Sequence, residues 1–65
     1  MKKKMKKCDI CDRPDLDIIV DGKTIHGPWA WMCVDCYREV GVGLGLGRGQ
    51  LFIQYKDGEL IKIAG

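Results

Sequence analysis

Two short stretches contain all four cysteines of the chain, Cys8-Asp9-Ile10-Cys11 and Cys33-Val34-Asp35-Cys36. Two residues separate the cysteines within each pair, and residues 12–32 separate the pairs. Two thiolates at this spacing can bind one tetrahedral ion from a tight turn or from the first turn of a helix. Two such pairs complete a four-sulfur shell. The spacing therefore predicts a structural Zn²⁺ site with the ligands Cys8, Cys11, Cys33 and Cys36.

Two other uses of four cysteines have to be weighed against zinc. Rubredoxin-like iron also takes four sulfurs, but it needs a tight turn at both pairs, whereas the second pair here is expected to open a helix. Disulfides are typical of small secreted proteins, but no apolar segment follows the basic residues 1–7, as a secretion signal would require. No stretch approaches the roughly 18 apolar residues that cross a membrane. We therefore expect reduced thiols on a metal, a cytoplasmic location and no membrane contact.

The length of 65 residues predicts a single zinc-binding domain over residues 8–65, preceded by a flexible basic tail over residues 1–7. A chain this short rarely gains more than about 3–5 kcal/mol from its apolar core. Structural zinc in a small finger contributes an apparent binding energy of about 10–16 kcal/mol, which becomes folding energy because the unfolded chain has no formed site. Metal binding is therefore expected to decide whether the chain folds.

The net charge of +2 is distributed unevenly. Five lysines, including Lys3 and Lys4, lie within residues 1–7, so residues 8–65 carry six basic against nine acidic side chains. A zinc ion held by four thiolates makes this body more negative still, at about −5. Zinc fingers that bind nucleic acid usually present a basic surface, because neutralising phosphates supplies their affinity. Here only the tail is basic.

The remaining sequence predicts two hairpins and one helix. β-branched residues flank Asp21-Gly22, which favours a hairpin over residues 17–25 with a two-residue turn. Residues 33–40 contain no helix breaker, so we expect a two-turn helix that Gly41 ends in the left-handed conformation.

A second hairpin is expected over residues 51–63, with a three-residue loop at 56–58 and Gly58 in the left-handed conformation. Its register places Gln54 and Lys62 on one face and five apolar side chains on the other: Leu51, Ile53, Tyr55, Ile61 and Ile63. The apolar face must cover either the first hairpin and Trp31 or a second subunit, since a two-stranded hairpin is marginal alone. A homodimer through this C-terminal hairpin is therefore one option.

Both tryptophans precede the second cysteine pair. Trp31 is two residues from Cys33, so it is expected to shield the metal–sulfur cluster. Trp29 is a candidate contact residue, because burying two indoles in so small a body is difficult. His26, the only histidine, is expected to be an ordinary strand residue, since four thiolates already saturate the metal.

Glycine occupies every odd position from Gly41 to Gly49. This pattern matches neither GxGxxG nor a P-loop. If the stretch is extended, one side of it is free of side chains, so a base, a ring or another backbone can lie against it. Arg48 is then the candidate residue for binding an acidic or phosphate group, with Gly45 and Gly47 in the same strip. The alternative is a pliable linker or a path packed over the metal module.

The order of cysteine pair, hairpin and second cysteine pair opening a helix resembles a treble-clef zinc finger over residues 8–41. Separately, Gly27-Pro-Trp-Ala, Met32-Cys-x-x-Cys and the run from Gly41 to Gln50 resemble a group of small four-cysteine proteins from phage, plasmid and bacterial genomes. The second resemblance implies a zinc role for the four cysteines and a mobile-element context, and it assigns no activity. The first pair departs from the commoner zinc knuckle, because Asp12 stands where glycine usually follows the second cysteine.

An enzyme is not expected, because a zinc ion with four sulfur ligands keeps no open position for water and the chain has no Ser/His/Asp set. Two classes of binding module remain. The acidic body favours a protein-interaction or modulator protein of phage or mobile-element type. The alternative is a nucleic-acid-binding finger that uses the lysine tail, Arg48 and an exposed tryptophan.

Overall fold

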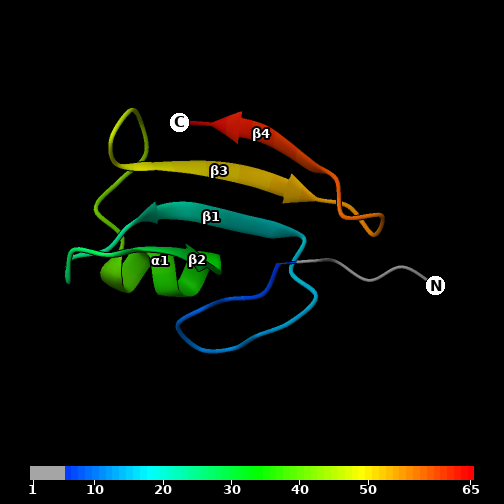
Figure 1. Ribbon diagram of the computed structural model, residues 1–65, viewed down its shortest axis with the longest axis horizontal. Coiled ribbons are helices and arrows are strands. Elements are labelled where there is room, and N and C mark those ends of the chain that lie inside the picture. The colour runs from blue at the N-terminus through cyan, green and yellow to red at the C-terminus, as the bar shows by residue number, and fades with distance from the viewer. Residues whose placement is uncertain (1–5) are drawn as a thin grey trace.

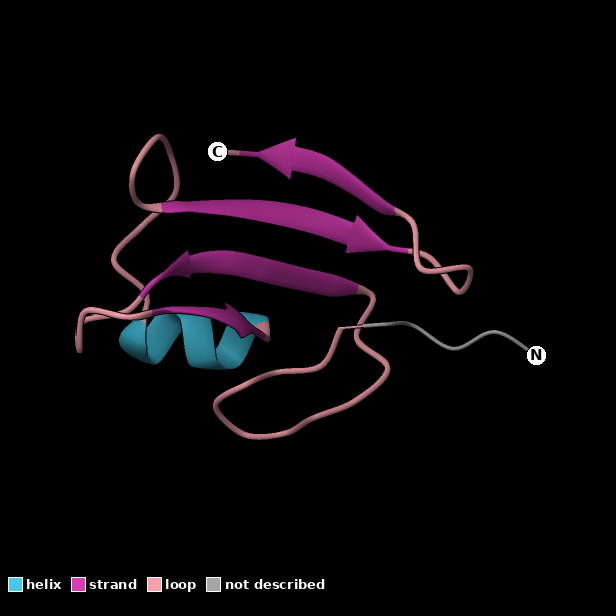
Figure 2. Ribbon diagram, in the orientation of Figure 1, coloured by secondary structure: helices cyan, strands magenta, loops and turns pink. Residues whose placement is uncertain are grey.

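The computed structural model describes residues 6–65 as a small α+β domain, with one antiparallel four-stranded sheet and one helix (Figures 1 and 2). The elements in chain order are β1 (Ile18–Lys23), β2 (Trp29–Met32), α1 (Val34–Val40), β3 (Gly49–Gln54) and β4 (Leu60–Ala64). The strand order is β2-β1-β3-β4, so β4 forms the sheet edge opposite β2. The helix contacts β1 and β2, as Figure 1 also shows. No helix in the described part of the chain is long and apolar enough to cross a membrane.

The hairpin predicted within residues 17–25 is wrong, because residues 18–23 form one continuous strand whose hairpin partner is β2. β1 continues through Asp21-Gly22, and its end at Lys23 pairs with Trp29 of β2. The reversal follows at residues 24–28, where the Gly27 N–H donates to the Thr24 carbonyl (2.9 Å) and Gly27 has a φ of 106°. Gly22 is required by β3 instead, because a Cβ there would lie 3.1 Å from the Arg48 carbonyl oxygen. Glycine at this position serves close strand packing rather than a turn.

The helix is confirmed over Val34–Val40, with Cys33 as its N-cap. The left-handed cap predicted at Gly41 is wrong: Gly41 is extended, with φ −74° and ψ 152°. Its N–H donates to the Tyr37 carbonyl (2.8 Å), and a Cβ there would lie 2.6 Å from that oxygen. Gly41 is therefore needed because the chain turns back tightly against the last turn of α1, and it then pairs with Thr24 beyond the end of β1.

The two faces of the sheet differ in cover. Val20, Gly22 and Thr24 are buried, whereas Asp21 and Lys23 between them are partly or fully exposed. Since neighbouring strand residues point to opposite faces and α1 contacts β1, the helix covers the face of Val20 and its register partner Met32. A core cluster contains Cys8, Leu16, Ile19, Val20, Met32, Cys33 and Cys36.

The C-terminal hairpin is confirmed, with Gly58 at a φ of 89°. Its apolar face does not cover Trp31. The ring that contacts Trp31 is Phe52, on the other face, with a centroid separation of 5.9 Å. Ile61 and Ile63 consequently remain 41% and 49% exposed.

Gln54, on the face expected to be polar, is buried at 2% exposure and fastens the N-terminal segment to the hairpin. Its side-chain amide accepts from the Lys6 N–H (2.6 Å) and donates to the carbonyls of Lys6 (3.0 Å) and Leu16 (3.0 Å). The described end of the expected tail therefore contacts the domain at Lys6. Residues 1–5, with Lys3 and Lys4, lie outside the described residues.

Candidate metal centre

The first cysteine pair forms a tight turn. The Asp12 N–H donates to the Cys8 carbonyl (2.9 Å), and the Cys8 N–H donates to the Arg13 carbonyl (3.0 Å). Asp12 has a φ of 63°, so an aspartate adopts the left-handed conformation that glycine would normally supply. The Cys11 N–H points to the Cys8 Sγ at 3.4 Å. The departure from the usual knuckle sequence therefore leaves a turn in which the two thiols share one side.

The second cysteine pair opens the helix. Cys33 follows β2 directly, and its Sγ accepts from the Cys36 N–H at 3.5 Å. The first turn of a helix has backbone N–H groups without helical partners, and the positive end of the helix dipole favours thiolates. Strand β2 and helix α1 together fix Cys33 and Cys36.

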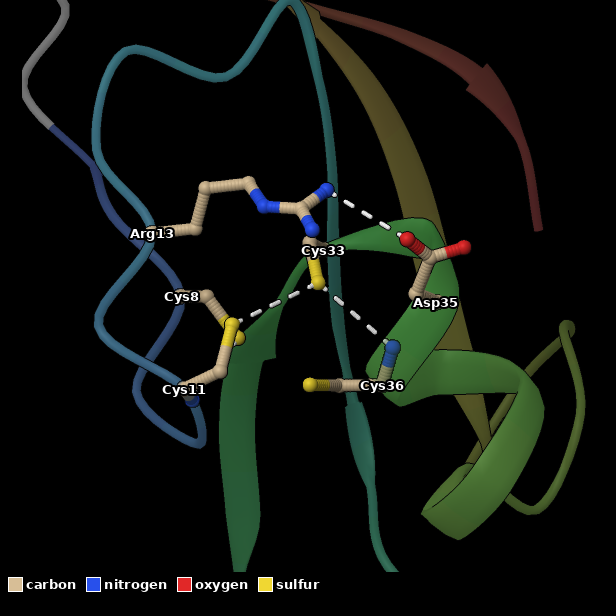
Figure 3. Close-up of polar contacts among 6 residues, drawn as sticks. All are labelled: Cys8, Cys11, Arg13, Cys33, Asp35 and Cys36. Atoms are coloured by element: carbon tan, nitrogen blue, oxygen red, sulfur yellow. Dashed lines mark hydrogen bonds and ion pairs between the residues drawn. The ribbon is translucent and has the colours of Figure 1, made fainter.

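The four sulfur atoms converge on one point. One Sγ atom from each of Cys8, Cys11, Cys33 and Cys36 lies within 4.8 Å of every other. Figure 3 shows the thiols of the two pairs pointing toward one another, with Cys11 Sγ and Cys33 Sγ 3.8 Å apart. A tetrahedral ion with metal–sulfur bonds of about 2.3 Å requires sulfur–sulfur separations of about 3.8 Å. The cluster therefore has the ligands and the size to hold a metal ion, while His26 lies outside it.

Two contacts between distant segments hold the pairs together. Asp9 lies beside β2, where its N–H donates to the Trp31 carbonyl (2.7 Å) and its carboxylate accepts from the Trp31 N–H (3.0 Å). The Arg13 side chain lies across the thiols toward Asp35, with a guanidinium–carboxylate distance of 3.3 Å (Figure 3). Sequence reasoning missed both contacts, because neither partner is near the other in the chain. The sequence feature that could have indicated these contacts was the acidic residue inside each cysteine pair, Asp9 and Asp35.

The surroundings of the four thiols do not favour the deprotonated form of all four together. Burial alone raises the pKa of the Cys8 thiol, but N–H groups of Cys11, Cys33 and Ile10 bring it down to about 6. Burial and the neighbouring thiols raise the pKa of Cys36 above its ordinary value. The pKa of the Arg13 guanidinium is raised, chiefly by the Cys33 sulfur and then by Asp35. A divalent cation at the centre would remove this conflict, since metal binding deprotonates its thiol ligands.

The glycine stretch is not an extended open strip, the first of the two alternatives considered for it. It turns back on itself, with reciprocal hydrogen bonds between Gly45 and Gly49 (2.8 and 3.0 Å). Gly43, Gly45 and Gly47 all have positive φ values. The Arg48 guanidinium lies against this loop, because a Cβ at Gly45 would be 3.1 Å from its Nη2. The side chain that was expected to project toward a partner is folded over the glycines.

The remaining candidate contact residue is separated from the sulfur cluster. Trp29 begins β2 and is 47% exposed. It lies at the end of β2 away from Met32 and Cys33.

Comparison of the chain with known protein families, with curated proteins and with solved structures gave no match.

Proposed function

We propose that the chain is a small zinc-stabilised binding module, with one structural Zn²⁺ held by Cys8, Cys11, Cys33 and Cys36. The observation that carries this proposal is the convergence of the four Sγ atoms within 4.8 Å of one another. Four thiolates saturate a tetrahedral zinc ion, which then has no position for a reacting water. The proposed role of the metal is therefore structural, and the activity of the module is binding.

Zinc is preferred to iron because the two cysteine pairs differ in structure. The first pair lies in a turn, hairpin β1–β2 follows, and the second pair opens α1. This order supports a treble-clef-like centre, whereas a rubredoxin-like iron site would have turns at both pairs. The resemblance to small four-cysteine proteins of mobile elements also implies zinc for the four cysteines, and it assigns no activity.

Metal analysis tests this assignment directly. Protein purified without added metal should contain one zinc per chain, and Cys11→Ser should lower the retained zinc, because a structural site needs all four ligands. Elemental analysis by plasma mass spectrometry measures both values. Lys56→Ser, an exposed change in the β3–β4 turn, is the control that should retain full zinc. A red protein that contains iron, or a folded protein without metal, would contradict the proposal.

A protein contact through the C-terminal hairpin is the second candidate, and the exposed apolar side chains of Ile61 and Ile63 favour it. Among the described residues β4 pairs only with β3, so its outer edge has free hydrogen-bonding groups. Exposed strand edges readily pair with a strand of another chain. A second copy of this chain is the simplest partner.

We expect Ile61→Lys to convert such a dimer to a monomer without loss of zinc, because the side chain is 41% exposed within one chain. A lysine there would have to be desolvated in the dimer. Sedimentation equilibrium over a range of protein concentrations measures the association. Ile25→Lys, an exposed isoleucine outside the hairpin, is the control that should leave it unchanged. A wild-type chain that stays monomeric throughout would rule out the self-contact.

A further inference from the structure

The sheet face opposite α1 is here called the open face. Strand alternation and the pairing register place Ile19, Gln54 and Leu60 on it, together with seven residues that are at least partly exposed: Asp21, Lys23, Trp29, Trp31, Gln50, Phe52 and Lys62. Ile19 and Gln54 are buried, and Gln54 is hydrogen-bonded to the backbone of Lys6 and Leu16, so the N-terminal segment covers this end of the face. The helix lies on the other face, against Val20 and Met32, and the remaining part of the open face is accessible.

Aromatic rings dominate the open face. Trp29 is 47% exposed, and Trp31 and Phe52 are half-buried with their ring planes tilted by 46°. Both tryptophans of the chain lie here. A domain of this size would be expected to use its largest apolar side chains in the core. Their position on the accessible part of this face indicates a contact surface for flat ligands.

Each of these rings has a lysine beside it. The Lys6 ammonium lies over a Trp31 ring, 4.8 Å from its centroid. Lys23 is the register partner of Trp29, and Lys62 is the register partner of Phe52. Two carboxylates lie near these lysines, Asp21 on the face itself and Asp9 at the edge of β2, where it accepts from the Trp31 N–H (3.0 Å). Three lysines therefore face two carboxylates here, whereas residues 8–65 as a whole carry more acidic than basic side chains.

We propose that the open face binds single-stranded nucleic acid, with one base stacked on Trp29 and further bases against the accessible surfaces of Trp31 and Phe52. Lys6, Lys23 and Lys62 would contact the phosphates. The combination matches the two repeating parts of a single strand, because every nucleotide has one π-face and one negative charge. This inference rests on the proposed binding function and specifies its ligand.

The pairing of rings with lysines also selects against other ligands. A duplex hides the faces of its bases, so it can offer the lysines its phosphates but cannot stack on the rings. An acidic peptide would satisfy the lysines but would leave most of the aromatic area uncovered. The lysines of the N-terminal sequence, at positions 2–4, would add attraction for phosphate that does not depend on base stacking.

Tryptophan fluorescence tests this proposal, because both indoles lie on the surface in question. Zinc-loaded protein is titrated with oligo(dT) and oligo(U) of about 15 nucleotides, within the range of single-strand site sizes. We expect saturable quenching by both strands, with an affinity that falls between about 50 and 200 mM salt. A DNA duplex of equal length should quench weakly.

Two matched pairs of variants locate the contact. Trp29→Ala should weaken oligo(dT) binding about 10-fold, the scale of one lost stacking contact. Tyr55→Ala should not weaken it, although Tyr55 is also 47% exposed, because it lies outside the open face. Lys23→Ala with Lys62→Ala should reduce the slope of log K against log salt by about 0.7 per lost phosphate contact. Lys56→Ala should leave that slope unchanged.

Several results would overturn the inference. A folded, zinc-loaded protein that binds no oligonucleotide would refute it while leaving the zinc-stabilised module intact. A protein without zinc would instead fail the proposed function first. Binding that disappears when residues 1–5 are deleted, and that Trp29→Ala does not change, would assign the affinity to the tail alone. Equal quenching by duplex and single strand would exclude stacking, and open-face variants that affect only a protein partner would assign the face to that partner.

Discussion

Removing the metal is expected to unfold the described domain completely. Three of the seven members of its core cluster are cysteines, Cys8, Cys33 and Cys36. Without a cation, burial and the neighbouring thiols disfavour the charged form of Cys36. Few apolar side chains remain to hold the N-terminal segment against the sheet. The metal contribution, about 10–16 kcal/mol for small structural sites, exceeds the roughly 3–5 kcal/mol that the core of so short a chain supplies.

Far-ultraviolet circular dichroism and tryptophan fluorescence measure this loss during titration with a chelator. Both signals should change together and should recover when zinc is returned, because metal binding and folding are coupled. Cys33→Ser should give the unfolded spectrum even with excess zinc, since Cys33 is both a ligand and the N-cap of α1. Val34→Ser, a partly exposed change inside the same cysteine pair, is the control that should remain folded. A cooperative thermal transition in the metal-free protein would contradict the prediction.

The sulfur cluster was predictable from sequence because its determinants are local. Two residues between cysteines place both thiols on one side of a turn or a helix start, whatever the rest of the chain does. The position of Cys33 at the start of α1 also followed from local signals, since residues 33–40 have no breaker. The contacts that join the pairs, Asp9 to β2 and Arg13 to Asp35, depend on tertiary placement. No local pattern encodes them.

Glycine caused the main errors of sequence reasoning. Asp21-Gly22 has the composition of a hairpin turn, but β3 approaches so closely that Gly22 is needed inside a strand. Gly41 ends the helix as predicted, yet the cause is the proximity of Tyr37 rather than a left-handed backbone. Gly58 behaves as expected, because a tight hairpin loop is itself a local structure. A glycine required by a distant strand cannot be distinguished in sequence from one required by a turn.

Polar residues inside strands gave the second kind of error. The alternation of residues 51–63 correctly separates Gln54 from Ile53 and Ile61. Which face is covered depends on where the N-terminal segment and Trp31 lie, and alternation does not contain that information. The face with Gln54 is covered near Leu16, while the more apolar face remains partly exposed. Gln54 is consequently a buried junction between two ends of the chain.

Replacing Gln54 by leucine is expected to destabilise the zinc-loaded protein by about 2–4 kcal/mol. The wild-type amide makes three hydrogen bonds to the backbone, two with Lys6 and one with Leu16. Leucine fits the volume but makes none of them, so partly buried N–H and C=O groups lose their partners, and each such loss costs about 1–3 kcal/mol. The expected loss corresponds to a decrease in melting temperature of at least about 10 °C for a domain of this size.

Urea denaturation at saturating zinc measures the free energy of unfolding, with Gln50→Leu as the matched control. Gln50 lies on the same strand and the same face and is only partly buried, and its side chain has no hydrogen bond to another residue of the described range 6–65. Its replacement should change stability by no more than about 0.5 kcal/mol. Gln54→Glu separates the bonds further, since a carboxylate still accepts from the Lys6 N–H but cannot donate to the Lys6 and Leu16 carbonyls. The Gln54→Glu protein should therefore also be less stable than the wild type. Equal stability of the Gln54→Leu and Gln50→Leu proteins would show that the Gln54 amide does not hold the N-terminal segment against β3.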